Sequence, residues 1–309
     1  MKEIKVFCPA TVANVSCGFD VLGLCLNTIG DEMTVRVIKE KEIRIKQITG
    51  QELPTDPQKN VAGVAALSLF EQIKSPFGFE IEIHKKIKPG SGIGSSAASA
   101  AGVVYAIDKL AKSALSKTEL VYHAMQGEVL ASGEAHADNV APAIFGGFTL
   151  VRGYQPLDII KIPSPKDLMV VIIHPQIEIK TSEARAILAE NIPLKTAITQ
   201  WGNLGGLVSG LYTDDYDLIG RSLTDVVAEP QRSKLIPGFT TIKEAAAKAG
   251  ALGSGISGSG PSVFALCQGI EKARDVEKSL KLVYSATGIP FETHISDINN
   301  EGVKTITEK

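Results

Sequence analysis

KPGSGIGSSAASAAGVV, residues 88–104, is the stretch on which the prediction of the fold depends. Three glycines alternate with small residues, and a serine pair leads into an alanine-rich run. Before it, apolar residues recur with a period of about two over Phe77–Ile83, which predicts a strand ending at a Pro-Gly turn. After it, Ala97–Leu110 has helical character. The predicted order is therefore strand, glycine loop, serine N-cap and helix.

This order of elements suits the binding of an anion. The first N–H groups of a helix have no partner inside the helix, and the helix dipole places about half a positive charge there. A loop without side chains lets an anion approach that end, so phosphate is the expected ligand. The alternative interpretation is a tight turn and a well-capped helix with no ligand.

Two common phosphate-binding signatures do not fit the chain. A Walker A loop ends in Gly-Lys-Ser/Thr, and the sequence contains no Gly-Lys pair. The glycines at 253, 255 and 258 match G-x-G-x-x-G, but Pro261–Cys267 after them predicts a strand. A dinucleotide-binding loop opens a helix instead, which argues against that class. The HRD and DFG elements of protein kinases are also missing.

Length and composition restrict the class of protein. A chain of 309 residues suits two domains, and 44% apolar with 21% charged residues is ordinary for a globular protein. The net charge is −2 and no basic cluster occurs, so neither nucleic acid nor a membrane is an expected partner. No apolar run approaches the roughly 20 residues of a membrane helix.

The N-terminus and the cysteines bear on the compartment. MKEIKVFCPATVANV lacks the apolar region of a signal peptide. The four cysteines, Cys8, Cys17, Cys25 and Cys267, show no metal-binding spacing and are expected to be reduced thiols. A cytoplasmic location is therefore expected.

Two further segments are rich in polar groups. Pro9–Asp20 is a loop of small residues whose Asn14 and Asp20 could either cap turns or bind a ligand. The segment from His136 to Gly147 contains His-x-Asp, which could be half of a metal site. No second His or Cys lies near, which disfavours zinc.

These motifs together resemble those of a known family. Residues 92–97, GIGSSA, are similar to the Gly-Leu-Gly-Ser-Ser-Ala core of the GHMP kinases, although the proline before the loop stands one place later than usual, at Pro89. PATVANVSCGFDVLG (9–23) and HADNVAPAIFGG (136–147) resemble homoserine kinases in particular. The resemblance implies transfer of phosphate from ATP to L-homoserine, giving O-phospho-L-homoserine on the way to threonine.

The resemblance also implies a fold. It predicts an α/β (α+β) two-domain chain of the GHMP kinase fold. Residues 1–155 would form a ribosomal-S5-like, ATP-binding domain, and residues 156–309 a ferredoxin-like domain, with the site between them. Glycines around Gly258 would let the second domain approach the phosphate loop. A homodimer is expected from the family alone.

Site residues follow from the same resemblance. ATP and Mg²⁺ would be the cofactors, with Glu128 and Ser96 as magnesium ligands, since Mg²⁺ takes few protein oxygens beside substrate phosphates. A bidentate guanidinium suits a carboxylate, and Asp20 suits an ammonium group. The expected catalytic residues are Glu128, Ser96 and Asn139. The expected substrate-binding residues are Asn14, Asp20, His136, Asn139, Thr181, Arg185, Arg232 and Gly258. The expected ATP-binding residues are Asn60, which could equally be a helix N-cap, with Pro89, Gly90, Ser91, Gly92, Ile93, Gly94, Ser95, Ser96 and Ala97.

The identity of a general base stays open. Asn139 stands where some relatives have an aspartate, and an amide is no base near neutral pH, so we expect no dedicated base; Asp138 is the rival candidate. Two other functions are possible: a kinase of the same superfamily acting on mevalonate or shikimate, and a regulator that binds ATP without catalysis. Thr196–Tyr212 is expected to be a buried helix in which Trp201 packs.

Overall fold

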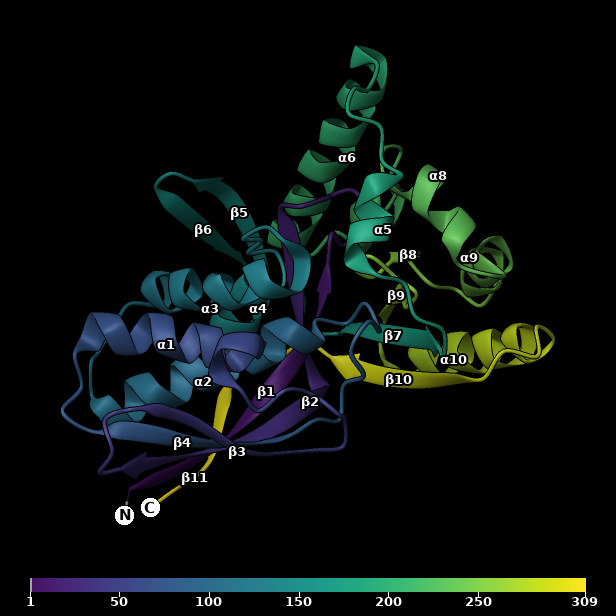
Figure 1. The fold of residues 1–309 in the computed structure, drawn as a ribbon. Coiled ribbons are helices and arrows are strands. Elements are labelled where there is room, and N and C mark those ends of the chain that lie inside the picture. The colour runs from purple at the N-terminus through teal and green to yellow at the C-terminus, as the bar shows by residue number, and fades with distance from the viewer. Residues whose placement is uncertain (1) are drawn as a thin grey trace.

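The computed structural model describes residues 2–309 as two β-sheets covered by helices (Figure 1). The first sheet runs in the order β11-β1-β2-β4-β3, and β5 extends it by pairing with both β2 and β6. Its strands are β1 (Glu3–Ala13), β2 (Leu22–Ile38), β3 (Ile43–Thr49), β4 (Gly78–His84), β5 (Phe148–Tyr154), β6 (Leu157–Ile162) and β11 (Lys304–Glu308). Only β3 and β4 pair in parallel.

Helices cover one face of this sheet (Figure 1). They are α1 (Val61–Ile73), preceded by the short 3-10 turn Pro57–Lys59, α2 (Ser95–Ala111), α3 (Lys117–Ser132) and α4 (Val140–Phe145). Gly102 and the alanines of α2 from Ala97 to Ala106 are buried, and this helix lies directly on β1 and β2. A Cβ on Gly102 would come 2.2 Å from Cys8 Sγ, which shows how closely helix and sheet approach.

The second sheet has the order β10-β7-β9-β8, all antiparallel. Its strands are β7 (Leu168–Pro175), β8 (Gly253–Ile256), β9 (Val263–Gln268) and β10 (Phe291–Asp297). With α9 (Phe239–Lys248) before β8 and α10 (Ile270–Ser285) between β9 and β10, this is the expected ferredoxin-like arrangement. Between β7 and α9 lie α5 (Thr181–Ala186), α6 (Leu194–Thr213), α7 (Tyr216–Ser222), α8 (Glu229–Arg232) and the 3-10 turn Ser233–Leu235.

Two apolar cores hold these layers. The larger one fills the space between the first sheet and its helices and continues into the second domain through Val170, Ile172 and Leu207. The smaller one lies between the other face of the second sheet and the helices α9 and α10, as at Val171 and Leu280. Because one core crosses from domain to domain, the two sheets are held in a fixed relation.

Most elements lie where the sequence places them. Asn60 caps α1 by accepting from the N–H groups of Ala62 and Gly63, and Ser116 forms a capping box with Glu119 at the start of α3. The division expected between residues 155 and 156 falls in the turn between β5 and β6, two strands that pair with each other. The division after residue 155 remains a proposal.

One expectation about packing is wrong. The helix expected over Thr196–Tyr212 is α6, and Figure 1 shows it projecting from the body of the molecule. Only Leu207, Gly210 and Leu211 of α6 are buried, and Trp201 is 57% exposed. Trp201 therefore does not pack in a core. Among residues 2–309, no helix has the combination of length and apolarity that crossing a bilayer requires.

Candidate active site

The glycine loop joins β4 to α2 and has an unusual backbone. Gly90, Gly92 and Gly94 have φ of 72°, 81° and 70°, which favours glycine at all three positions. Gly94, not a serine, is the N-cap of α2, and it makes no side-chain cap hydrogen bond. The expected serine N-cap is therefore wrong: Ser95 is the first helical residue, and its hydroxyl donates to the Ile87 carbonyl at 2.9 Å. The first turn of α2 is thus left without a capping side chain.

Two glycines of this loop also have no room for a side chain. A Cβ on Gly92 would lie 2.6 Å from the Gly260 carbonyl oxygen, and a Cβ on Gly94 would lie 2.0 Å from Thr11 Oγ1. Thr11 belongs to the motif near the N-terminus and Gly260 to the loop between β8 and β9. The glycine loop is therefore in close contact with both domains.

The loop between β8 and β9 is hydrogen-bonded to the glycine loop, as expected from its glycines. Ser257 Oγ donates to the Gly92 carbonyl at 2.7 Å, and the Ser262 N–H donates to the Ser91 carbonyl at 3.2 Å. Gly258 N–H donates to the Ala13 carbonyl at 3.2 Å. The β8–β9 loop of the second domain thus positions the glycine loop of the first domain.

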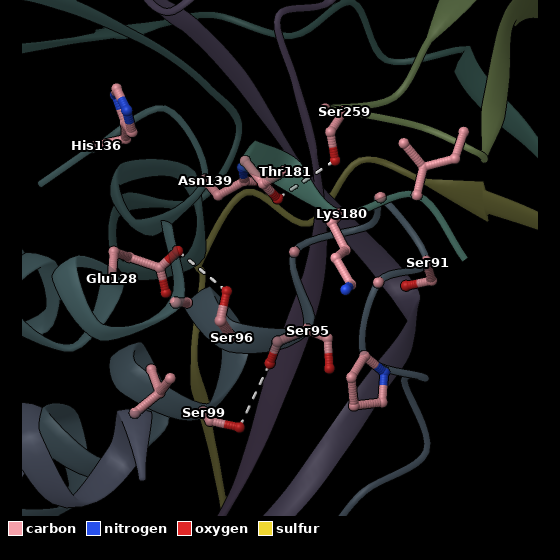
Figure 2. Close-up of a pocket in the computed structure, with 18 of the residues that line it drawn as sticks. Ser91, Ser95, Ser96, Ser99, Glu128, His136, Asn139, Lys180, Thr181 and Ser259 are labelled. Atoms are coloured by element: carbon pink, nitrogen blue, oxygen red, sulfur yellow. Dashed lines mark hydrogen bonds between the residues drawn. The ribbon is translucent and has the colours of Figure 1, made fainter. Parts of the chain in front are cut away.

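A cavity of about 430 Å³ lies where these segments meet. It is bordered by almost every residue that the sequence predicts: Asn14, Asp20, Asn60, Pro89, Gly90, Ser91, Gly92, Gly94, Ser95, Ser96, Glu128, His136, Asn139, Thr181, Arg185, Arg232 and Gly258. Figure 2 shows several of them facing one another. The side chains of Ile93 and Ala97 are buried in the core instead.

Several residues that border the cavity carry no sequence motif. They include Lys85 at the end of β4, Ser99 in α2, and Glu178, Lys180 and Ser259 from the second domain. Each stands outside the glycine loop and the homoserine kinase motifs, so only the fold brings it to the site.

One end of the cavity has apolar walls and Asn60. Leu53, Pro54, Val61 and Ile83 lie there, which suits a flat heteroaromatic ring. The Asn60 amide donates to the Pro54 carbonyl at 2.8 Å while its oxygen caps α1. The N-cap role is confirmed, and contact with a nucleotide base stays a prediction.

Glu128 of α3 and Ser96 of α2 face each other across the cavity (Figure 2). The Ser96 hydroxyl donates to Glu128 Oε2 at 3.0 Å. Burial raises the pKa of the Glu128 carboxyl to about 7, while the Ser96 hydrogen bond acts in the opposite direction. Within residues 2–309 no group of three or more His, Cys, Asp or Glu could hold a metal ion. One carboxylate and one hydroxyl nevertheless fit Mg²⁺, which takes its other ligands from phosphate and water.

The other end of the cavity is lined by charged side chains. Arg185 of α5 donates to both carboxylate oxygens of Asp20, at 2.9 Å each. The guanidinium of Arg232 lies 4.9 Å from the centre of the Phe19 ring and that of Arg185 lies 5.7 Å from it. Asn14 accepts from the Asp20 N–H at 3.0 Å, so it does cap this turn. An acid and two arginines therefore gather within reach of one small molecule.

Arg232 is almost completely buried beside this group. Its Nε donates to the Ala184 carbonyl at 2.9 Å and its Nη1 to the Gly258 carbonyl at 3.2 Å. Burial lowers the pKa of Arg232, whereas Asp20 raises it. Both carbonyls thus hold the guanidinium in one orientation.

His136, Asp138 and Asn139 form the wall between the two ends of the cavity. Asn139 Oδ1 accepts from Thr11 Oγ1 at 2.7 Å, and the Asn139 N–H donates to Asp138 Oδ1 at 3.1 Å. Burial, and then the charge of Asp20, raise the pKa of Asp138 to about 6. His136 Nε2 lies 3.0 Å from the Glu134 carboxylate, and Thr181 Oγ1 lies 3.5 Å from Ser259 Oγ.

Comparisons with known proteins agree with this fold and site. Residues 60–147 match the family described as GHMP kinases N terminal domain, and residues 207–286 match GHMP kinases C terminal. A homoserine kinase of Chlorobium phaeobacteroides is 46% identical over 99% of this chain and 100% of its own length. One of Chlorobaculum tepidum is 44% identical over 99% of both chains.

A solved structure gives the same result. The crystal structure of homoserine kinase from Cytophaga hutchinsonii superposes with a TM-score of 0.95 at 50% identity, covering 98% of this chain and 97% of the other. The relatives and the solved structure cover 98–99% of the chain, and the two domain families match parts of both halves. The chain belongs to the homoserine kinase family of GHMP kinases.

Proposed function

We propose that this protein transfers the γ-phosphoryl group of ATP to the hydroxyl of L-homoserine, giving O-phospho-L-homoserine and ADP. Its membership of the homoserine kinase family supports this activity. The observation that carries the substrate assignment is the far end of the cavity, where Asp20, Arg185 and Arg232 lie together. A small amino acid is a zwitterion and needs both signs of charge there.

The Asp20–Arg185 pair explains how a zwitterion is selected. In the structure the two side chains satisfy each other through two hydrogen bonds. We infer that the homoserine ammonium group binds Asp20 and that its carboxylate binds Arg185 and Arg232, replacing one ion pair by two. An uncharged or purely anionic alcohol cannot make that exchange, because it would leave Asp20 without a cation.

Glu128 and Ser96 are proposed to hold Mg²⁺ beside the phosphates, since their oxygens already meet at 3.0 Å. The ion would neutralise charge on the triphosphate, and the glycine loop and the N-terminus of α2 would bind the phosphate groups. Burial raises the pKa of the Glu128 carboxyl, so a cation beside it would stabilise the charged form.

Phosphoryl transfer requires alignment more than a strong base. The bond from the γ-phosphorus to its bridging oxygen breaks with its electron pair going to ADP, and the homoserine oxygen bonds to phosphorus. In a loose transition state the homoserine oxygen is only weakly bonded to phosphorus, so its hydroxyl becomes acidic late in the reaction. The proton can then pass to a phosphoryl oxygen. Asn139, held by Thr11, would align the substrate without accepting a proton.

Asp138 offers a direct test of this mechanism. Asp138→Asn is expected to lower kcat less than about tenfold, because general-base catalysis, which typically contributes about 100- to 10,000-fold, is not used. Burial and Asp20 raise the pKa of Asp138 to about 6, so a catalytic Asp138 would make kcat/KM change near pH 6. We expect the pH profiles of kcat/KM to be the same near pH 6 for the unmodified protein and for Asp138→Asn. A loss of several orders of magnitude in kcat, at unchanged homoserine affinity, would establish Asp138 as the base.

The function itself is tested by ADP release with ATP and Mg²⁺ over a panel of L-homoserine, L-threonine, L-serine, mevalonate, shikimate and buffer. Fast turnover on L-homoserine alone is the expected result. Turnover on mevalonate or shikimate would preserve the fold and overturn the substrate. No turnover on any compound, with ATP still bound, would favour the regulatory function instead.

The oligomeric state of the protein is proposed from the family and from exposed apolar side chains, and its compartment from the cysteines. A homodimer is the family expectation, and exposed apolar side chains on α6, such as Leu194, Ile198 and Trp201, support it as buriable surface. A monomeric mass by light scattering at micromolar concentration would contradict it.

The cytoplasm is proposed because all four cysteines are buried free thiols. A disulfide in the native protein would count against that location.

A further inference from the structure

We propose that Lys180, a residue of the second domain, contacts the ATP triphosphate and stabilises the negative charge that shifts during transfer. Lys180 immediately precedes α5 and borders the same cavity as the glycine loop. Figure 2 shows its side chain extending toward that loop, with the amino group on the side of Ser91 and Ser95. This inference rests on the proposed function, which supplies the ATP.

The glycine loop brings no positive side chain of its own. Residues 89–98 contain neither lysine nor arginine, so the loop offers only backbone N–H groups and the end of a helix. A triphosphate carries about four negative charges, of which one divalent cation neutralises two. In other phosphate loops a lysine side chain reaches the β- and γ-phosphates. A lysine from elsewhere in the fold is therefore the missing component.

The other cations that border the cavity already have anionic or carbonyl partners. Lys85 pairs with the buried carboxylate of Asp31, and Lys59 lies 3.6 Å from Asp56. Arg185 binds Asp20, and Arg232 donates to two carbonyls. Among the ion pairs found for residues 2–309, none includes Lys180. It is the cation available for phosphate.

The backbone that carries Lys180 is held against the glycine loop. The Gln176 side chain accepts from Lys88 Nζ at 3.3 Å, and Glu178 Cγ lies 3.0 Å from the position of a Cβ on Gly90. Ile179, directly before Lys180, is buried in the core of the second domain. The segment 176–180 is therefore anchored on both sides, and it holds the lysine above the phosphate site.

This placement gives Lys180 a role in the transition state. As the bond from γ-phosphorus to its bridging oxygen breaks, negative charge grows on the β-phosphate, and an ammonium group there interacts more strongly than in the ground state. Lys180 would act through its charge and takes no part in proton transfer. Its loss should therefore lower kcat more than it weakens the binding of homoserine, which lies at the other end of the cavity.

The test compares Lys180→Gln with Lys278→Gln, which removes the same charge from an exposed lysine of α10 that does not border the cavity. Lys180→Gln is expected to lower kcat about 30- to 100-fold and to leave homoserine affinity within about twofold. Lys180→Arg should recover at least tenfold of that loss, because a cation is restored. Lys278→Gln should stay within about threefold of the unmodified protein.

The outcomes separate this inference from the function on which it rests. Equal effects of the two glutamine variants, no effect of Lys180→Gln, or failure of the arginine variant to recover activity would each overturn the role of Lys180. If the unmodified protein does not phosphorylate homoserine at all, the proposed function fails. ATP affinity measured by calorimetry then decides for Lys180: it must fall in Lys180→Gln and not in Lys278→Gln.

Discussion

Replacing Arg232 by alanine is expected to weaken L-homoserine binding about 30- to 1000-fold while ATP binding stays nearly unchanged. A charged hydrogen-bonding group contributes about 2–4 kcal/mol to the binding of a carboxylate, which corresponds to that range. The effect should be confined to homoserine, because the Arg232 guanidinium lies over the Phe19 ring and near Asp20, where the homoserine carboxylate is proposed to bind. Calorimetric titration with each ligand separately measures it.

Two variants control for damage to the fold. Arg232→Lys keeps a cation near Phe19 but loses the fork that reaches Ala184 and Gly258, so an intermediate loss of affinity is expected. Arg221→Ala removes an exposed arginine of α7 and should change neither affinity. If Arg232→Ala loses ATP and homoserine to the same degree, the arginine is structural and the proposed clamp is wrong.

Replacing Lys85 by methionine is expected to lower the free energy of unfolding by about 3–5 kcal/mol. The Lys85 ammonium group is buried and donates to Asp31, to the Ser95 carbonyl at 2.8 Å and to Ser99 Oγ at 3.1 Å. Without it the Asp31 carboxylate is a buried charge with no cation, which is costly in a low-dielectric interior. Equilibrium unfolding in urea measures the change.

A second substitution shows whether charge is the cause. Asp31 Oδ1 also accepts from the N–H groups of Lys86 and Ile87, so asparagine can keep that acceptor while removing the charge. Asp31→Asn combined with Lys85→Met is therefore expected to recover about half or more of the lost stability. If the double variant is as unstable as the sum of the single ones, the lysine acts through packing alone.

Features that depend on residues close together in the sequence are predicted correctly, whereas features that depend on distant residues are not. The Asn60 cap depends on residues within three positions of it, so the sequence predicts it correctly. The cavity was predictable because each motif is contiguous, although its parts lie far apart in the chain. Lys85 and Lys180 were missed because nothing local marks them, and their partners are supplied by other strands and the other domain.

Two errors have physical causes of the same kind. A serine of the pair 95–96 is expected to cap a helix that begins at Ala97, but Gly94 adopts a φ of 70° and is itself the N-cap, so the helix begins at Ser95. The apolar residues of α6 predict burial, yet only Leu207, Gly210 and Leu211 of this helix are buried. Hydrophobicity alone does not say whether the chain itself or another molecule covers a helix face.

The pairing of β11 with β1 has a consequence for how the chain is made and divided. Strand β11, residues 304–308, completes the edge of the first sheet beside Ile4 and Val6, although more than a hundred residues of the second domain precede it. During synthesis the first domain cannot finish its sheet until the second has emerged from the ribosome. A single cut between the domains would yield an N-terminal fragment with an unpaired edge strand, prone to associate with other copies. Separate expression of the ATP-binding half therefore requires grafting residues 298–309 onto it.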